Sequence, residues 1–335
     1  MNIGIIGFGI QGRIRLQTIQ KWNGPHRVTA ICDTVEPSES DLCGAKYIDR
    51  YQDIIKDDNI QAIFVCTPNF LTAPVVVAGL NDGKHVFSEK PPGRTLDETR
   101  QMAEALERNP RCKLMFAFNH RHHESVMTAK RVVDSGDLGD ILWMRGRYGK
   151  SVVPEFGGSW RAQRKYAGGG ILLDQGIHML DLFLLFLGDL LEVKAYVSNL
   201  FWKLDVEDNV FAIFRNNKGQ VASLHSTMTQ WRHLFSMEIF LTKGHVILNG
   251  LLTSSGTYGE EELSIARNRF YAGPSVSWEN EEKTTYGVNT SWENEMRLFF
   301  ECIEHDIPVP ECNIADALKV MELVDRIYSE GSNAT

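Results

Sequence analysis

An apolar stretch of the chain carries three ionisable side chains at helical spacing. Asp174, His178 and Asp181 follow the glycine run Gly168–Gly170 within GGGILLDQGIHMLD. Positions i, i+4 and i+7 share one face of an α-helix, and the apolar residues around them predict a buried helix. Buried charge is costly unless it is paired or used. The stretch is therefore either a structural acid–histidine pair, or a proton-transfer site that a ligand approaches at the glycines.

The start of the chain carries a dinucleotide-binding pattern. Gly7, Gly9 and Gly12 form G-x-G-x-x-G directly after an apolar run, and Asp33 ends the next one. The first glycine permits a tight turn, the second lets a pyrophosphate approach the backbone, and the third lets the following helix pack closely on the strand. Asp33 stands where an acid accepts hydrogen bonds from the adenosine ribose, and it would repel a 2′-phosphate. We therefore predict a dinucleotide site that takes NAD in preference to NADP. The alternative to such a site is a glycine turn that binds nothing.

Two charged residues follow another apolar strand within HVFSEKPPG. Glu89 and Lys90 emerge at the carboxyl end of a parallel sheet, where open α/β folds bind ligands. Pro91 and Pro92 restrict the backbone beyond them, and the Lys90–Pro91 bond can be cis. An exposed ion pair in a rigid turn explains the same residues equally well.

The preceding strand ends in CTPN, residues 66–69. Thr67 and Asn69 can either hydrogen-bond a cofactor or cap the helix that follows. The sequence favours the cap.

The spacing of apolar residues predicts two domains. Up to residue 120, apolar strands alternate with amphipathic helices, which indicates a Rossmann doubly wound parallel sheet with helices on both faces. From residue 121 to 335, one helix precedes strands of alternating polarity joined by hairpins at NNKG and TKG, and residues 313–331 predict a closing helix. We predict an α/β chain with a dinucleotide-binding domain over 1–120 and an α+β domain with an open, mainly antiparallel sheet over 121–335.

Composition restricts the partners. The net charge of -8 over 335 residues argues against nucleic acid and anionic membrane. The six cysteines form no C-x-x-C pair, the first residues do not form a signal peptide, and no apolar run approaches a membrane span, so we predict a cytoplasmic protein with free thiols. His120, His122, His123 and Glu124 lack zinc-like spacing, which predicts a solvated helix start and no metal site.

In this order and spacing, G-x-G-x-x-G, EKP and GGGILLDQGIHMLD resemble the glucose-fructose oxidoreductase / inositol dehydrogenase (Gfo/Idh/MocA) family along the whole chain. The resemblance implies an NAD(P)-dependent dehydrogenase that transfers hydride to or from a carbinol or ketone carbon of a sugar, cyclitol or nucleotide-linked sugar. It also implies that Lys90 binds the reacting oxygen, with Glu89 supporting it. His178 is then the general acid/base, which Asp174 positions while contacting the substrate. Residues 121–335 would bind substrate and form a homodimer or homotetramer through the outer face of the sheet.

The expected contact residues follow from these patterns. Cofactor contacts are expected at Gly7, Phe8, Gly9, Ile10, Gly12, Asp33, Thr67, Pro68, Asn69, Glu89 and Lys90. Further substrate contacts are expected at Asn119, Arg121, Trp160, Arg161, Lys165 and Tyr166. The basic residues at 161–165 suit a carboxylate or the diphosphate of a nucleotide sugar, and a mobile basic loop is the alternative. A non-catalytic NAD-binding sugar sensor is the alternative function, but the presence of both Lys90 and His178 favours an enzyme.

Overall fold

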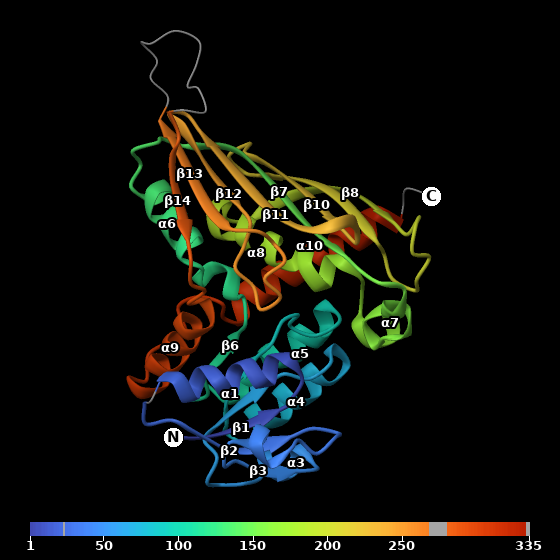
Figure 1. Ribbon diagram of the computed structural model, residues 1–335, viewed down its shortest axis with the longest axis vertical. Helices are drawn as coiled ribbons and strands as arrows, with labels where there is room; N and C mark the ends of the chain where they lie inside the picture. Colours follow the sequence, from blue (N-terminus) through green and yellow to red (C-terminus); the bar gives the residue numbers. More distant parts are fainter. Residues whose placement is uncertain (23, 268–279, 333–335) are drawn as a thin grey trace. The chain divides into compact units, whose positions relative to one another are not determined.

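The computed structural model describes residues 1–22, 24–267 and 280–332 (Figure 1). The chain forms two compact units. The first unit contains Met1–Asn119, Lys165–Gly168 and Trp292–Met321, and the second contains His120–Arg164, Gly169–Ser291 and Glu322–Thr335. The units interleave along the sequence, because Lys165–Gly168 and Trp292–Met321 belong to the first unit. Separate domains over 1–120 and 121–335 stay a prediction.

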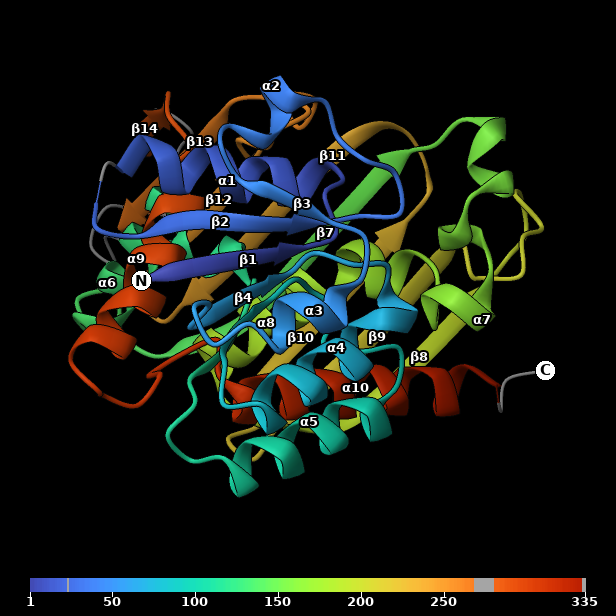
Figure 2. The same cartoon turned by 90° about the horizontal axis from the view of Figure 1, so that it is seen from below.

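The first unit is built on a parallel sheet in the order β3-β2-β1-β4-β5-β6. Figure 2 shows β2, β1 and β4 next to one another in this order. The strands are β1 (Asn2–Ile6), β2 (Arg27–Cys32), β3 (Lys46–Ile48), β4 (Ala62–Val65), β5 (His85–Ser88) and β6 (Leu114–Phe116). The helices are α1 (Ile10–Trp22), α2 (Glu39–Leu42), α3 (Tyr51–Ile55), α4 (Asn69–Asn81), α5 (Leu96–Arg108) and α9 (Ser291–Glu304). This strand order is that of dinucleotide-binding Rossmann sheets, which confirms the predicted class.

Helix α9 returns from near the end of the chain to the first sheet. Phe64 of β4 and Phe87 of β5 stack with ring centroids 5.0 Å apart, and Phe299 of α9 packs edge-on against both, at 5.9 and 5.4 Å. Such aromatic pairs add to the stabilisation from apolar burial. The sequence pattern did not predict this helix or its place.

The second unit contains a mixed sheet in the order β14-β13-β12-β11-β7-β10-β9-β8. The strands are β7 (Ile141–Ser151), β8 (Leu190–Ser198), β9 (Asn209–Asn216), β10 (Val221–Thr227), β11 (Thr229–Leu241), β12 (Gly244–Asn249), β13 (Glu261–Arg267) and β14 (Glu282–Tyr286). The hairpins β9–β10 and β11–β12 are antiparallel as predicted, whereas β10 pairs with β7 in parallel. The sheet is therefore mainly antiparallel, as expected.

The remaining helices are short, apart from three. The longer ones are α6 (Glu124–Asp134), α8 (Ile177–Leu187) and α10 (Ile314–Ser332). The short ones are α7 (Arg164–Ala167), the 3₁₀ helices Asn119–His122, Pro154–Gly158 and Trp160–Ala162, and a π-helical turn, Leu172–Gly176. In Figure 1, α6 and α8 lie against one face of the eight-stranded sheet.

One helical run is more apolar than expected. By length and composition alone, Arg164–Leu187 is long and apolar enough to cross a membrane, which corrects the prediction that no apolar run approaches that length. Some 72% of its apolar window is buried inside the protein, and α8 packs on β7 and β10. Packing in the protein core accounts for this apolar composition.

Candidate functional site

The three motif glycines of the first unit have different surroundings. Gly7 has a φ of +92°, and a Cβ there would lie 2.4 Å from the carbonyl oxygen of Cys66. A Cβ on Gly12 would lie 2.2 Å from the carbonyl oxygen of Gly7. At Gly9, by contrast, no described atom lies within 4 Å of the position a Cβ would take. The loop is therefore packed at its ends and open at its centre, as a backbone that receives a pyrophosphate must be.

An acidic side chain lies against this loop. Asp33 directly follows β2, and its carboxylate accepts hydrogen bonds from the backbone N–H groups of Phe8 and Thr34. Helix α1 begins at Ile10, directly after Gly9, so Gly12 lies in its first turn. The sheet thus brings the acid and the glycine loop together at the carboxyl ends of neighbouring strands.

The CTPN segment does not cap the helix that follows it. Helix α4 begins at Asn69 with Pro68 at the N-cap, and no side chain caps it. The Asn69 amide instead donates to the carbonyl oxygen of Ala167 at 2.8 Å. The Thr67 hydroxyl oxygen is buried and has no hydrogen-bond partner among the described residues. The predicted cap is wrong, and the Thr67 hydroxyl can donate to a ligand.

Glu89 and Lys90 lie at the carboxyl end of β5, where the sequence placed them, and the Lys90–Pro91 bond is cis. Glu89 Oε1 accepts hydrogen bonds from Nε and Nη2 of Arg15 at 2.9 and 2.5 Å. Arg15 belongs to α1 and was not singled out from the sequence. Lys90 is half-buried.

In the second unit, the regular helix predicted through the three ionisable residues is interrupted. Asp174 lies in the π-helical turn, and His178 and Asp181 lie in α8. Asp181 is fully buried and forms a two-point ion pair with Arg121, at 2.8 and 2.5 Å. Two guanidinium donors of Arg121, an expected substrate residue, are therefore engaged by the protein itself.

Asp174 and His178 have polar and aromatic neighbours that the sequence did not reveal. Lys150 of β7 donates to the Asp174 carboxylate. The imidazole of His120 stacks on that of His178, with ring centroids 3.7 Å apart and an interplanar angle of 14°. His120 Nε2 in turn lies 3.0 Å from the Tyr148 hydroxyl. The alternating pattern of GRYGK in β7 could have indicated Tyr148 and Lys150.

Two tyrosines line this part of the second unit. Burial, together with the nearby Tyr258 and Asp174, raises the pKa of Tyr148 well above its usual value. Burial is also the main cause that raises the pKa of Tyr258, whose hydroxyl donates to Gln175 Oε1 at 2.8 Å. Both phenols therefore stay protonated at neutral pH.

The glycine run serves internal packing. A Cβ on Gly169 would lie 1.9 Å from the Tyr328 hydroxyl oxygen. A Cβ on Gly170 would lie 2.2 Å from the Glu207 carbonyl oxygen. The Glu207 carboxylate accepts N–H bonds from the last glycine and from Leu172, although burial raises its pKa. Protein atoms occupy the positions that Cβ atoms would take at Gly169 and Gly170, so internal packing accounts for these two glycines, and the approach of a ligand to this segment stays a prediction.

The other expected substrate residues lie in short helical segments. The Arg161 guanidinium lies over the Trp160 ring, 4.4 Å from its centroid, and Lys165 lies 5.2 Å from the Tyr166 ring centroid. Asn119 begins a 3₁₀ helix. By unit, Asn119, Lys165 and Tyr166 belong with the glycine loop, whereas Arg121, Trp160 and Arg161 belong with His178.

The histidine cluster is buried. His120, His122 and His123 are at most 4% exposed, so the predicted solvated helix start is wrong. His123 Nδ1 lies 2.8 Å from Glu261 Oε2, and this contact lowers the pKa of Glu261 against the effect of its burial. Glu124 begins α6. The cluster therefore anchors the segment that precedes α6.

Comparisons with known proteins cover most of the chain. The model "Oxidoreductase family, NAD-binding Rossmann fold" of GFO/IDH/MocA matches residues 1–118, and the GFO/IDH/MocA C-terminal domain matches residues 126–247. Levoglucosan dehydrogenase from Pseudarthrobacter phenanthrenivorans is 27% identical over 289 residues, which cover 74% of this chain and 73% of that protein. Inositol 2-dehydrogenase from Salmonella typhimurium is 30% identical over 162 residues, 47% of this chain and 48% of that protein.

A solved structure has the same fold along the whole chain. Levoglucosan dehydrogenase in complex with NADH and levoglucosan gives a TM-score of 0.87 at 24% identity, covering 99% of this chain and 97% of that one.

Proposed function

Because the chain belongs to the GFO/IDH/MocA family of NAD(P)-dependent oxidoreductases, we propose that it oxidises a carbinol carbon of a sugar, cyclitol or nucleotide-linked sugar with NAD, and reduces the ketone in reverse. The observation that carries this proposal is the glycine loop, open at Gly9, with the Asp33 carboxylate beside it. Lys90 and His178 add the side chains that the reaction needs.

The first unit fits a dinucleotide. The open backbone at Gly9 suits a pyrophosphate. The Thr67 hydroxyl, which finds no hydrogen-bond partner in the described part of the chain, suits a hydrogen bond to the cofactor. Asp33 would accept ribose hydroxyls and repel a 2′-phosphate, which supports NAD over NADP. NAD, when bound, supplies the acceptor of the hydride.

The proton and the charge are handled by side chains of the chain itself. In the proposed oxidation His178 takes the hydroxyl proton, Lys90 stabilises the developing alkoxide, and Asp174 contacts the substrate and positions His178. The stack on His120 restrains the orientation of the His178 ring, as its proposed role requires. Lys150 donates a hydrogen bond to the Asp174 carboxylate and so restrains its position.

The outer face of the second sheet supports self-association. Tyr196 of β8 pairs with Phe211 of β9, and both are more than half exposed, as is Ile213. Large exposed apolar patches mark interaction surfaces. We expect a homodimer or homotetramer through this face, and Phe211→Arg should reduce the mass measured by light scattering. The six free cysteines suit the reducing cytoplasm.

The test of the proposed function is the growth of NADH absorbance. The protein is mixed with NAD and, in turn, with inositols, free sugars, sugar acids and nucleotide sugars. Growth with one class identifies the substrate class. No change in NADH absorbance with any of these classes, and none when NADH is mixed with the matching ketones, would refute the proposed enzyme. If calorimetry then shows NAD binding, a sugar sensor is favoured.

A further inference from the structure

A buried charge network joins three segments of the first unit. Arg15, Glu89 and Glu295 are 1%, 9% and 0% exposed. Arg15 Nη1 donates to Glu295 Oε1 at 2.6 Å, while its Nε and Nη2 donate to Glu89 Oε1. One guanidinium therefore bridges a carboxylate of α9 and a carboxylate at the carboxyl end of β5.

The network is costly for a purely structural contact. Two buried carboxylates share one guanidinium, so the network carries an excess negative charge when both are ionised. Glu295 Oε2 accepts no hydrogen bond from any described residue. Burial, opposed by Arg15, raises the pKa of Glu295 to about 7, and both Glu89 and Glu293 add to the rise. Buried ion pairs often contribute less stability than apolar residues of the same shape, so stability alone does not account for this network.

The network ends one residue from the proposed catalytic lysine. Glu89 is held at its side chain by Arg15 and at its backbone N–H by the carbonyl oxygen of Val65, at 2.8 Å. Lys90 follows directly, so the backbone from which its side chain extends is fixed by these contacts.

We propose that Glu295 is a positioning residue for Lys90: it holds Arg15, and Arg15 holds Glu89 and with it the backbone of Lys90. This inference rests on the proposed function only for the role of Lys90 in turnover. The positioning itself involves residues of the first unit alone.

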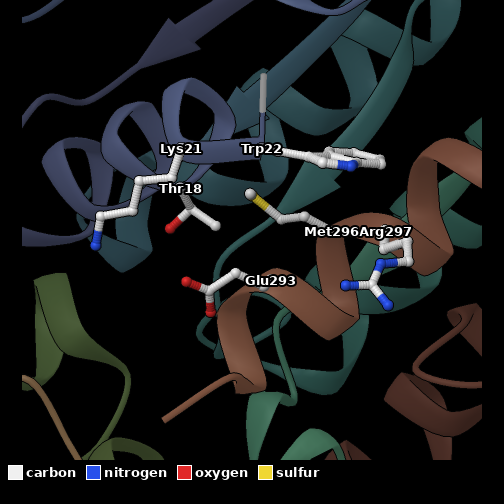
Figure 3. Close-up of a pocket in the computed structure, with 6 residues that line it drawn as sticks. All are labelled: Thr18, Lys21, Trp22, Glu293, Met296 and Arg297. Carbon is white, nitrogen blue, oxygen red and sulfur yellow. The ribbon is translucent and has the colours of Figure 1, made fainter. Parts of the chain in front are cut away.

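Helix α9 also offers a matched control. Glu293, two residues before Glu295, lines a surface pocket of about 230 Å³ between α1 and α9 (Figure 3). The other lining residues are Thr18, Lys21, Trp22, Met296 and Arg297. Glu293→Gln removes one negative charge from the same helix without removing a partner of Arg15.

The experiment measures Lys90 directly and then turnover. Acetic anhydride labels Lys90 in the intact protein over a range of pH, and mass spectrometry gives the rate. Glu295→Leu removes the acceptor of Arg15, whereas Arg15→Lys keeps the positive charge but loses the fork that bridges both carboxylates. We expect both variants to change the labelling rate of Lys90 at least about threefold and to lower kcat about 10- to 100-fold, because small misplacements of catalytic groups have effects of that size.

The controls should leave Lys90 unchanged. We expect Glu293→Gln to label and to turn over within about twofold of the parent, and Glu295→Gln, which keeps an oxygen acceptor for Arg15, to retain most of kcat. The KM for NAD should stay within about threefold in every variant. If Glu295→Leu does not fold, the labelling rate of Lys90 and the kcat of Arg15→Lys test the proposal instead.

Unchanged labelling and kcat in Arg15→Lys, or equal effects from Glu293→Gln, would overturn the proposal. Labelling needs no substrate, so a parent protein that turns over no polyol would refute the proposed function without deciding the positioning.

Discussion

Glutamine in place of Glu295 should change how the stability of the protein depends on pH. The folded protein holds the pKa of Glu295 near 7, above the ordinary value of 4.5, chiefly because the carboxyl is buried. Between these two pH values the folded state binds a proton that the unfolded state has released. The stability that this proton contributes is therefore present at low pH and is lost as the pH rises through 7. Glutamine resembles the protonated carboxyl but does not titrate, so Glu295→Gln should lack this loss.

The magnitude follows from the two pKa values. Each tenfold change in proton affinity is worth about 1.4 kcal/mol, so between pH 5 and pH 8 the parent should lose about 2 to 3 kcal/mol relative to Glu295→Gln. Urea unfolding of both proteins, followed by tryptophan fluorescence at several pH values, measures this difference. Histidines whose pKa values burial lowers titrate in both proteins and cancel: His26, His85, His225 and His233. A difference that stays constant within about 0.5 kcal/mol from pH 5 to 8 would refute the reasoning.

Four further substitutions test separate parts of the structure. Lys90→Met should abolish turnover while calorimetry still shows NAD binding, and a variant with the parental rate would remove the lysine from the mechanism. Gly9→Val should keep the parental melting temperature but weaken NAD binding at least about 100-fold, because its side chain meets only the space proposed for the pyrophosphate. Gly12→Val should instead lower the melting temperature, because its Cβ would lie 2.2 Å from a carbonyl oxygen. Asp181→Asn should cost about 3 to 5 kcal/mol in urea unfolding, since it removes a carboxylate charge that pairs with the buried Arg121, and a loss below about 1 kcal/mol would contradict that pairing.

Local patterns predicted the elements that depend on neighbouring residues. The strand, glycine loop, helix and acid from Ile3 to Asp33 follow one another within about thirty residues, so their spacing was enough to predict the Rossmann unit. The hairpins of the second sheet follow from turn residues in the same way. The parallel pairing of β7 with β10 joins strands about 75 residues apart, and alternation of polarity does not record which strands pair.

The sequence was enough to select candidate residues, but it did not reveal the contacts that hold them in place. Asp174 and His178 were singled out because buried charge needs an explanation, and Lys90 because it follows a strand at the carboxyl end of the sheet; their roles stay predictions. What supports them was not found, because the partners come from distant segments. Arg15 and Glu295 are 280 residues apart, and Asp174 meets Lys150 only after β7 and the π-helical turn have packed together. No sequence period connects such pairs.

The glycine run shows that one pattern can have a cause other than the one first inferred. Glycines at 168–170 were interpreted as space for a ligand, yet at 169 and 170 a methyl group would collide with Tyr328 or with the backbone of Glu207. The Glu207 carboxylate then binds the N–H groups at the start of the segment that leads into Asp174 and His178, as N-terminal capping side chains do. The glycines therefore act on the proposed acid/base group indirectly. They let protein atoms come close enough to fix the helix that carries it, which is the rigid support that proton transfer at a defined distance requires.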